Sequence, residues 1–204
     1  MKLKNFIRRC LFPTRIFGSG NKCNIKKPKS RKNFIIYIRG NNNFIDIDEM
    51  CILENTQITI VGDNNHLIID KTARFLGPCK VLMEGNSILH IGRNAGIRGV
   101  DFLLSNANIS IGESCMFSYG IILRNHDSHK VIDTTSDQIV NLSKDINIEK
   151  HVWIGQNCSI LKGVTIGQDS IIALGAVVTK SCGSNCILAG NPAKVVKSNI
   201  LWDY

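Results

Sequence analysis

The side chains best suited to chemistry lie close together in one short segment of the chain. This segment is Arg124-Asn125-His126-Asp127-Ser128-His129, the densest group of titratable and hydrogen-bonding residues in the sequence. Histidine titrates close to neutral pH and is therefore the side chain best matched to taking a proton from a hydroxyl group. We therefore expect general-base chemistry at this segment.

The chain has five histidines, and only two of them lie in this segment. His66 and His90 fall on the regular repeat described below, and His151 precedes Val152 within a hexad, so we expect these three on the surface without a catalytic role. His126 and His129 remain as candidate bases. The residue types alone do not choose between them.

The elements that position these residues are indicated by a strict six-residue period. Large aliphatic side chains occur at Ile148, Ile154, Ile160, Ile166, Ile172 and Val178. Small or slender residues follow each of them by four places, at Val152, Cys158, Val164, Ser170, Ala176 and Cys182. An α-helix would repeat its apolar face at three, four and seven residues, and a half-buried strand at every second residue. Period six instead predicts short strands joined by turns in a stacked solenoid.

A longer repeat precedes these hexads, from about Phe34 onward. Asparagines recur at one corner, at Asn42, Asn64, Asn86 and Asn106, where they can adopt left-handed backbone geometry and hydrogen-bond the turn. Within the coils the six-residue step continues, for example at Ile91, Ile97 and Leu103. The rhythm stops after Leu123 and resumes at Ile148. Such a long interruption of a compact repeat is a candidate functional loop, at about 124–147.

The hexads also resemble a known family. Ile154-Gly155, Ile166-Gly167 and Ile172-Ala173 resemble the hexapeptide of left-handed parallel β-helix acyltransferases. Three segments are similar to those of the sugar and xenobiotic O-acetyltransferase branch: 151–155, 175–180 and 189–194. The resemblance implies an all-β, left-handed parallel β-helix that transfers acetyl from acetyl-CoA to a sugar hydroxyl. It also implies a homotrimer with active sites between subunits, and no metal.

The resemblance assigns a base and an aromatic partner. In related sugar O-acetyltransferases the catalytic histidine begins a loop that ends in a Val-Trp-Ile-Gly hexad, and several members carry Arg-x-x-Asp-x-His. This pattern places the base at His129, and Trp153 follows 24 residues later in the chain. The alternative register, which is similar to the Asn-His of antibiotic acetyltransferases, places the base at His126. Trp153 would be a platform for substrate.

Donor and acceptor residues are likewise implied by the resemblance. Acetyl-CoA would lie in a groove between subunits lined by Gly155, Leu174, Gly175, Ala176, Thr179 and Lys180, with Lys194 and Lys197 at its phosphates. Ala173-Leu174-Gly175 departs from the common Gly-Ala-Gly and could narrow this groove. Galactoside-type relatives carry an acceptor-binding Asn where this chain has Arg98, and an arginine suits a carboxylate or phosphate. We therefore expect an anionic sugar, as in a capsule or lipopolysaccharide, with Arg124 and Asp127 also near it.

Three alternatives stay open at this point. The acceptor could be the amino group of a nucleotide sugar, or an antibiotic hydroxyl, on the same fold. The chain could also be a non-catalytic solenoid that binds polyanions.

Length, charge and cysteine usage set the remaining expectations. The 204 residues suit one domain, which we divide into a basic N-terminal segment (1–33), the β-helix (34–190) and a C-terminal helical tail (191–204). Residues 1–32 hold 11 Lys/Arg and no Asp/Glu. We expect a short helix before Pro13, a linker over 18–32, and at most peripheral membrane contact there, with no nucleic-acid partner. The eight cysteines are expected to be reduced and the protein cytoplasmic.

Overall fold

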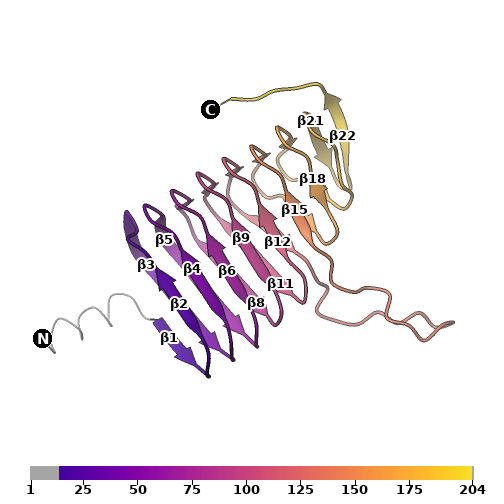
Figure 1. Cartoon of the computed structure of the whole chain (residues 1–204). Helices are drawn as coiled ribbons and strands as arrows, with labels where there is room; N and C mark the ends of the chain where they lie inside the picture. The colour runs from indigo at the N-terminus through magenta and orange to yellow at the C-terminus, as the bar shows by residue number, and fades with distance from the viewer. Residues whose placement is uncertain (1–13, 204) are drawn as a thin grey trace, which may run out of the picture.

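The chain forms a β-solenoid, which a computed structural model describes for residues 14–203 (Figure 1). Every regular element in this range is a β-strand, and all the strands but the last stack coil upon coil in parallel. Each coil contributes to three faces, which we call face 1, face 2 and face 3 in the order that the chain visits them. Among the described residues, no helix is present that could cross a membrane.

Face 1 is a seven-stranded parallel sheet. It consists of β2 (Lys22–Ile25), β4 (Phe44–Ile47), β6 (His66–Ile69), β9 (Ile88–Ile91), β12 (Ile109–Ile111), β15 (Ile146–Ile148) and β18 (Thr165–Ile166).

Faces 2 and 3 are joined by two long strands that turn from one face to the other, β3 (Ser30–Arg39) and β5 (Ile52–Val61). Face 2 continues through β7 (Arg74–Phe75), β10 (Gly96–Ile97), β13 (Met116–Phe117), β16 (Trp153–Ile154), β19 (Ile171–Ile172) and β21 (Cys186–Gly190). Face 3 comprises β1 (Thr14–Phe17), β8 (Cys79–Glu84), β11 (Val100–Ser105), β14 (Ile121–Arg124), β17 (Ser159–Leu161) and β20 (Val177–Val178).

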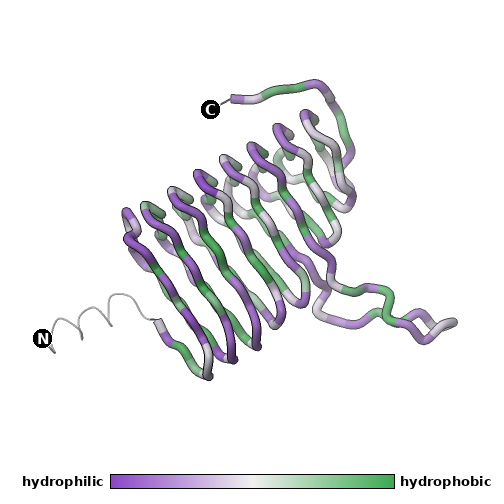
Figure 2. Tube along the Cα trace, viewed as in Figure 1, coloured by the Kyte–Doolittle hydropathy of each residue, from purple (hydrophilic) through white to green (hydrophobic). Residues whose placement is uncertain are grey.

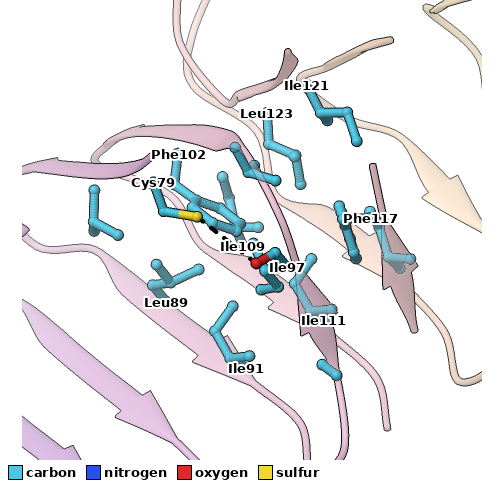
Figure 3. Close-up of a cluster of buried hydrophobic side chains, with 14 of the residues drawn as sticks. Cys79, Leu89, Ile91, Ile97, Phe102, Ile109, Ile111, Phe117, Ile121 and Leu123 are labelled. Carbon is cyan, nitrogen blue, oxygen red and sulfur yellow. Dashed lines mark hydrogen bonds between the residues drawn. The ribbon is translucent and has the colours of Figure 1, made fainter. Parts of the chain in front are cut away.

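The six-residue period arises because each face contributes one large inward side chain per coil. On face 1, Ile148 pairs with Ile111 of the coil before it and with Ile166 of the coil after it. These side chains are fully or almost fully buried, as is the column of apolar residues along the interior (Figure 3). Hydrophobic residues accordingly recur along the chain from coil to coil (Figure 2). One predicted core position is wrong, because Phe102 points inward, with an exposed fraction of 0%, and its neighbour Leu103 does not. The step from Ile97 is five residues at this corner.

The asparagine corners have the predicted left-handed geometry. The φ angles are 54° at Asn42, 58° at Asn64, 46° at Asn86 and 50° at Asn106. A second asparagine ladder lies beside them, and there the buried Asn65 amide donates to the Asn43 side-chain oxygen at 3.0 Å. Because these amides bond to one another from coil to coil, the buried side chains of Asn43 and Asn65 are hydrogen-bonded within the corner.

Free cysteines occupy small inward positions, as expected. Cys115 and Cys158 are buried, Cys182 is half-buried, and no disulfide occurs among residues 14–203. Burial raises the pKa of the Cys115 thiol to about 12, so this thiol stays protonated and behaves as a compact apolar side chain.

Both expectations about the ends of the solenoid need correction. The expected linker over 18–32 instead contains β2 and the first part of β3, so the first coil begins before residue 34. Cys23 and Ile25 turn inward and cover the next coil, and Lys22 and Asn24 of the same strand turn outward. The helix expected before Pro13 lies outside the described residues.

The predicted C-terminal helix is also wrong. Residues Ala193–Ser198 form β22, which pairs antiparallel with β21. Val195 and Val196 favour a strand, and β21 offers an unpaired edge at the end of the solenoid that β22 covers. The chain then returns as an extended tail past the last coils (Figure 1).

Candidate active site

The predicted loop lies between β14 and β15 and extends away from the solenoid (Figure 1). It therefore leaves the body at the edge where faces 3 and 1 meet. Its outer part is a narrow arm, closed by a backbone hydrogen bond of 3.0 Å from Val140 to Val131 and by a bridge between Ile132 and Ile139. Five apolar side chains of the arm are exposed: Val131, Ile132, Ile139, Val140 and Leu142.

The base of the loop is a tight turn held by Arg124. The guanidinium donates from Nε to the carbonyl oxygen of His126 at 3.0 Å and from Nη2 to Ser128 Oγ at 2.6 Å. Ser128 has a φ of 64°, so the turn places a non-glycine residue in the left-handed region. The Arg124 side chain thus fixes the backbone that carries both candidate histidines.

His126 is buried within this turn, with an exposed fraction of 9%. Its Nδ1 accepts a hydrogen bond from the backbone N–H of Ser128 at 3.2 Å. Burial, and secondarily the positive charge of Arg124, lower the pKa of His126 below its ordinary value. A neutral imidazole whose Nδ1 accepts a hydrogen bond carries its proton on Nε2, and that nitrogen can then only donate.

His129 is the exposed histidine of the pair. Its backbone is fixed, because its N–H donates to the carbonyl of Asp127 at 2.8 Å and its carbonyl accepts from Asn141 Nδ2 at 2.7 Å. Its side chain lines a cavity of about 240 Å³ together with His126, Lys130 and Leu142. The imidazole has no hydrogen-bond partner among residues 14–203 and is therefore available to a ligand.

Asp127 ties the loop to the solenoid. Its carboxylate accepts from Asn141 Nδ2 at 2.9 Å and pairs with Lys162, whose Nζ also donates to the carbonyl of Asn141 at 2.9 Å. The hydrogen bond from Lys162 lowers the pKa of this carboxyl. Asp127 and Arg124, which the resemblance placed near the acceptor, both make contacts within the loop that hold His129 in place.

Trp153 lies on β16 of face 2 with 45% of its side chain exposed. It lines a cavity of about 360 Å³ with Arg98, Met116, Ser118 and Trp202. Arg98 follows β10, two coils before Trp153 on the same face. The structure therefore brings together the predicted aromatic platform and the predicted acceptor-binding arginine.

The structure does not bring His129 and Trp153 together within one chain. His129 stands at the edge between faces 3 and 1, and Trp153 stands on face 2, which is the side of a three-faced coil opposite that edge. The two residues line separate cavities. A site that uses both must therefore take them from two copies of the chain.

The predicted donor residues lie near the C-terminal coils. Leu174 and Gly175 form the exposed corner between β19 and β20, and Gly175 has a φ of 73°. Gly155 is packed against this corner so closely that an added Cβ would lie 2.8 Å from the Leu174 nitrogen. Ala176 is buried and can contribute only backbone, whereas Thr179 and Lys180 are exposed at the edge shared by faces 3 and 1. Lys194 and Lys197 are exposed on β22.

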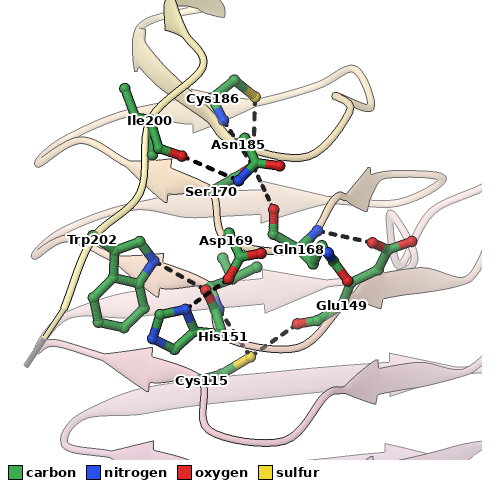
Figure 4. Close-up of polar contacts among 11 residues, drawn as sticks. Cys115, Glu149, His151, Gln168, Asp169, Ser170, Asn185, Cys186, Ile200 and Trp202 are labelled. Carbon is green, nitrogen blue, oxygen red and sulfur yellow. Dashed lines mark hydrogen bonds and ion pairs between the residues drawn. The ribbon is translucent and has the colours of Figure 1, made fainter.

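The other three histidines lie on the solenoid surface, as predicted. His66 is exposed on β6, and His90 pairs with Asp70 at 3.1 Å. His151 is half-buried and its Nδ1 lies 2.8 Å from Asp169 Oδ1 (Figure 4). Within residues 14–203, no group of three His, Cys, Asp or Glu residues is arranged to bind a metal.

Sequence reasoning missed the residues that support the site. Asn141 and Lys162 anchor the loop, and Trp202 forms part of the Trp153 cavity. Lys162 is 35 residues from Asp127 and gave no local signal. The available signal for Trp202 was its rarity, since the chain has only two tryptophans. The expected helical tail would not have directed its side chain toward Trp153.

Comparison with known proteins agrees with this architecture. Residues 145–180 match the bacterial transferase hexapeptide (six repeats) family. The chain is 32% identical to the polysialic acid O-acetyltransferase of Neisseria meningitidis over 91% of its own length and 86% of that protein. The chain belongs to the hexapeptide-repeat O-acetyltransferases. The fold class predicted from the hexads, a left-handed parallel β-helix with a long loop, is confirmed.

Other members of the hexapeptide-repeat O-acetyltransferases show the same similarity. The polysialic acid O-acetyltransferase of Escherichia coli O1:K1 / APEC is 37% identical over 66% of this chain, and the match spans 43% of that relative's length. The crystal structure of the polySia-specific acetyltransferase NeuO has 35% identity and a TM-score of 0.92, covering 96% of this chain and 90% of that one. The structure of the polysialic acid O-acetyltransferase OatWY has 30% identity and a TM-score of 0.83, covering 94% and 91%.

Proposed function

We propose that this protein transfers an acetyl group from acetyl-CoA to a hydroxyl group of an anionic sugar in a capsular polysaccharide. The similarity to polysialic acid O-acetyltransferases over nearly the whole chain supports this acceptor class. Arg98 beside Trp153 is the feature of this chain that suits an acidic sugar, because a guanidinium can bind a carboxylate with two hydrogen bonds.

His129 is the general base of the proposed reaction. The observation that carries this assignment is the contrast between the two loop histidines: the His129 imidazole is exposed and unengaged, whereas Nδ1 of His126 already accepts the Ser128 N–H. His129 takes the proton of the acceptor hydroxyl as its oxygen attacks the thioester carbonyl. The tetrahedral intermediate collapses, the carbon–sulfur bond breaks, and the imidazolium returns the proton to the leaving thiolate.

The proposed site is shared between copies of the chain, in a homotrimer. His129 of one copy would face Trp153 and Arg98 of the next, which is the only way that residues on opposite sides of the solenoid can meet. The exposed apolar arm of the loop supports such an assembly, because a row of five exposed aliphatic side chains needs a protein surface to cover it. Acetyl-CoA would lie against the Leu174–Gly175 corner, with Lys194 and Lys197 near its phosphates.

The basic first coil is proposed as an accessory contact. In the described part of residues 1–32, seven Lys/Arg side chains occur and no acidic ones. Lys26 pairs with Asp48 of the next coil at 3.1 Å, and the remaining charge gives this end of the solenoid a positive field. It would attract a polyanionic acceptor or an anionic membrane surface, which suits a cytoplasmic protein at the inner face of the membrane.

The decisive experiment measures thiol release from acetyl-CoA over a panel of acceptors. The panel holds sialic and uronic acid oligosaccharides, neutral sugars, amino sugars and chloramphenicol. We expect turnover on an acidic sugar, reduced about 10²–10⁴-fold by His129→Ala and much less by His126→Ala. Turnover confined to amino sugars would show an N-acetyltransferase instead, and turnover confined to chloramphenicol an antibiotic acetyltransferase.

A further inference from the structure

The last residues of the described chain return to the face that carries Trp153. The segment 199–203 leaves β22 and is fixed to the solenoid by a pair of hydrogen bonds with Asn185 (Figure 4). The Ile200 N–H donates to the Asn185 carbonyl, and Asn185 Nδ2 donates to the Ile200 carbonyl, both at 3.1 Å. The course of the tail is therefore set by contacts of its own backbone with Asn185.

Trp202 is held in one orientation by His151. The indole lies on the imidazole with ring centroids 4.0 Å apart and planes 3° from parallel, and its Nε1 donates to the His151 carbonyl at 3.0 Å (Figure 4). Nδ1 of His151 lies 2.8 Å from Asp169, which fixes the imidazole in turn. The indole is therefore held by a ring contact and a hydrogen bond, and part of it lines the cavity of about 360 Å³ that Trp153 also lines.

Trp202 also lies against Trp153. The two indoles have centroids 6.0 Å apart with planes inclined by 47°, so they form an angled aromatic wall. Trp202 and Asp203 line the same cavity as Arg98 and Ser118, which add a guanidinium and a hydroxyl. An apolar wall with a few polar groups at its rim is the usual composition of a small-molecule subsite.

A sugar ring matches this composition better than the other candidate occupant. A pyranose presents an apolar face of C–H groups and a rim of hydroxyls, and an acidic sugar adds a carboxylate that suits Arg98. The pantetheine arm of acetyl-CoA is a flexible chain without a charged group and offers the guanidinium no carboxylate.

We propose that Trp202 is a positioning and specificity-determining residue of the acceptor subsite, where the tail 199–203 supplies one wall against which the acceptor sugar ring packs. This inference rests on the proposed function, because it requires that the protein bind a sugar at this face. It goes beyond that function by assigning a role to the tail and to a residue outside the hexads.

Steady-state kinetics test the role of Trp202. In Trp202→Ala we expect the KM for the acceptor to rise about tenfold, with the KM for acetyl-CoA unchanged. Trp202→Phe keeps a flat ring over His151 and should recover most of the acceptor affinity. Leu201→Ala is the matched control, since this neighbouring tail residue is 80% exposed and does not line the cavity. Thermal unfolding of each variant separates these effects from loss of folding.

Fluorescence gives a second measurement that needs no turnover. The chain has two tryptophans, so Trp202 is the sole tryptophan fluorophore in Trp153→Phe. We expect a sialic acid oligosaccharide to change the Trp202 emission saturably, and coenzyme A alone to leave it unchanged. Neutral maltose serves as the control sugar and should have a much weaker effect.

The outcomes distinguish this inference from the proposed function. If wild-type protein releases no thiol with any acidic sugar, the proposed function fails. If wild-type protein is active and Trp202→Ala leaves the acceptor KM unchanged, the proposed function stands and the inference about the tail is overturned. A response of Trp202 to coenzyme A and not to the oligosaccharide would also overturn it, because the wall would then belong to the donor.

Discussion

The Nδ1 atom of His126 accepts a hydrogen bond from the backbone N–H of Ser128, at 3.2 Å. This contact is broken when the imidazole is protonated, because both ring nitrogens are then donors. It therefore couples the folded state of the loop between β14 and β15 to pH. It also distinguishes two histidines that lie only three residues apart.

Acid should destabilise the loop through His126. Burial and Arg124 lower the pKa of His126 below its unfolded value of 6.5, so protonation is disfavoured in the folded state. Its contribution to stability is fully present above pH 6.5 and is lost as the pH falls toward the lowered folded pKa. We expect the wild-type unfolding free energy to fall more steeply between pH 7 and pH 5 than that of His126→Gln. Urea titrations across this range measure the difference, and parallel pH profiles for the two proteins would contradict the assignment.

Mixed assemblies should recover activity that neither parent variant has. If each site takes His129 from one copy and Trp153 from the next, His129→Ala and Trp153→Ala chains placed together form some sites with both residues intact. Random mixing in a closed ring leaves about one quarter of the sites intact. Co-expression followed by the thiol-release assay measures this.

The control for mixing is co-expression of His129→Ala with itself under a second affinity tag, which should stay inactive. Absence of any recovery, with mixed assemblies shown by tandem purification, would place both residues in a site within one chain.

The anchor between Lys162 and Asp127 should affect turnover more than stability. Lys162→Met removes the cation that pairs with Asp127 and donates to the Asn141 carbonyl, so the loop that carries His129 loses its tie to the solenoid. We expect kcat to fall on the order of tenfold, because small displacements of a catalytic group are costly. The melting temperature should change little.

Lys144→Met is the matched control for Lys162, since Lys144 is exposed on the same loop and does not line the cavity that His129 lines. Equal losses of kcat in both variants would indicate that loop charge, rather than the anchor, is responsible.

The corner beneath Arg98 should tolerate only glycine. A Cβ added to Gly77 would lie 1.4 Å from the Arg98 carbonyl oxygen, so Gly77→Ala must push apart two neighbouring coils. We expect a loss of roughly 3 kcal/mol or more in unfolding free energy, together with a higher acceptor KM if Arg98 moves. Gly183→Ala is the control, because nothing lies within 4 Å of its added Cβ. Urea unfolding of the two variants makes the comparison, and similar stabilities would contradict the prediction.

Much of the fold could be predicted from the sequence because a solenoid is a local repeat. Each large residue of the hexads, such as Ile154 or Ile166, packs inside its own coil and against the same position of the next coil. The periodicity of the coils is therefore visible in the sequence itself. The asparagine corners were predictable for the same reason. The preference of Asn64 for the left-handed backbone conformation depends only on the residues of its own turn.

The ends of the solenoid were decided by packing between segments. Cys23 and Ile25 look unremarkable among lysines, yet the open end of the first coil buries them and makes a strand of an expected linker. Val195 and Val196 follow a proline, and the local sequence does not decide whether this segment forms a helix or a strand. The unpaired edge of β21 made that segment a strand, and so directed the tail toward Trp153.

The sequence by itself determined the repeat, the position of the loop and the residue types that it carries. Only the tertiary structure decided which of these residues can act together. His126 and His129 are nearly equivalent as a pattern, and one hydrogen bond from Ser128 distinguishes them. His129 and Trp153 are close in the sequence, but the coil places them on opposite sides of the solenoid. Trp202 is 49 residues from Trp153, and a returning tail places their rings side by side. Local periodicity specifies the coil, whereas contacts between distant segments depend on how the ends and the loop pack upon it.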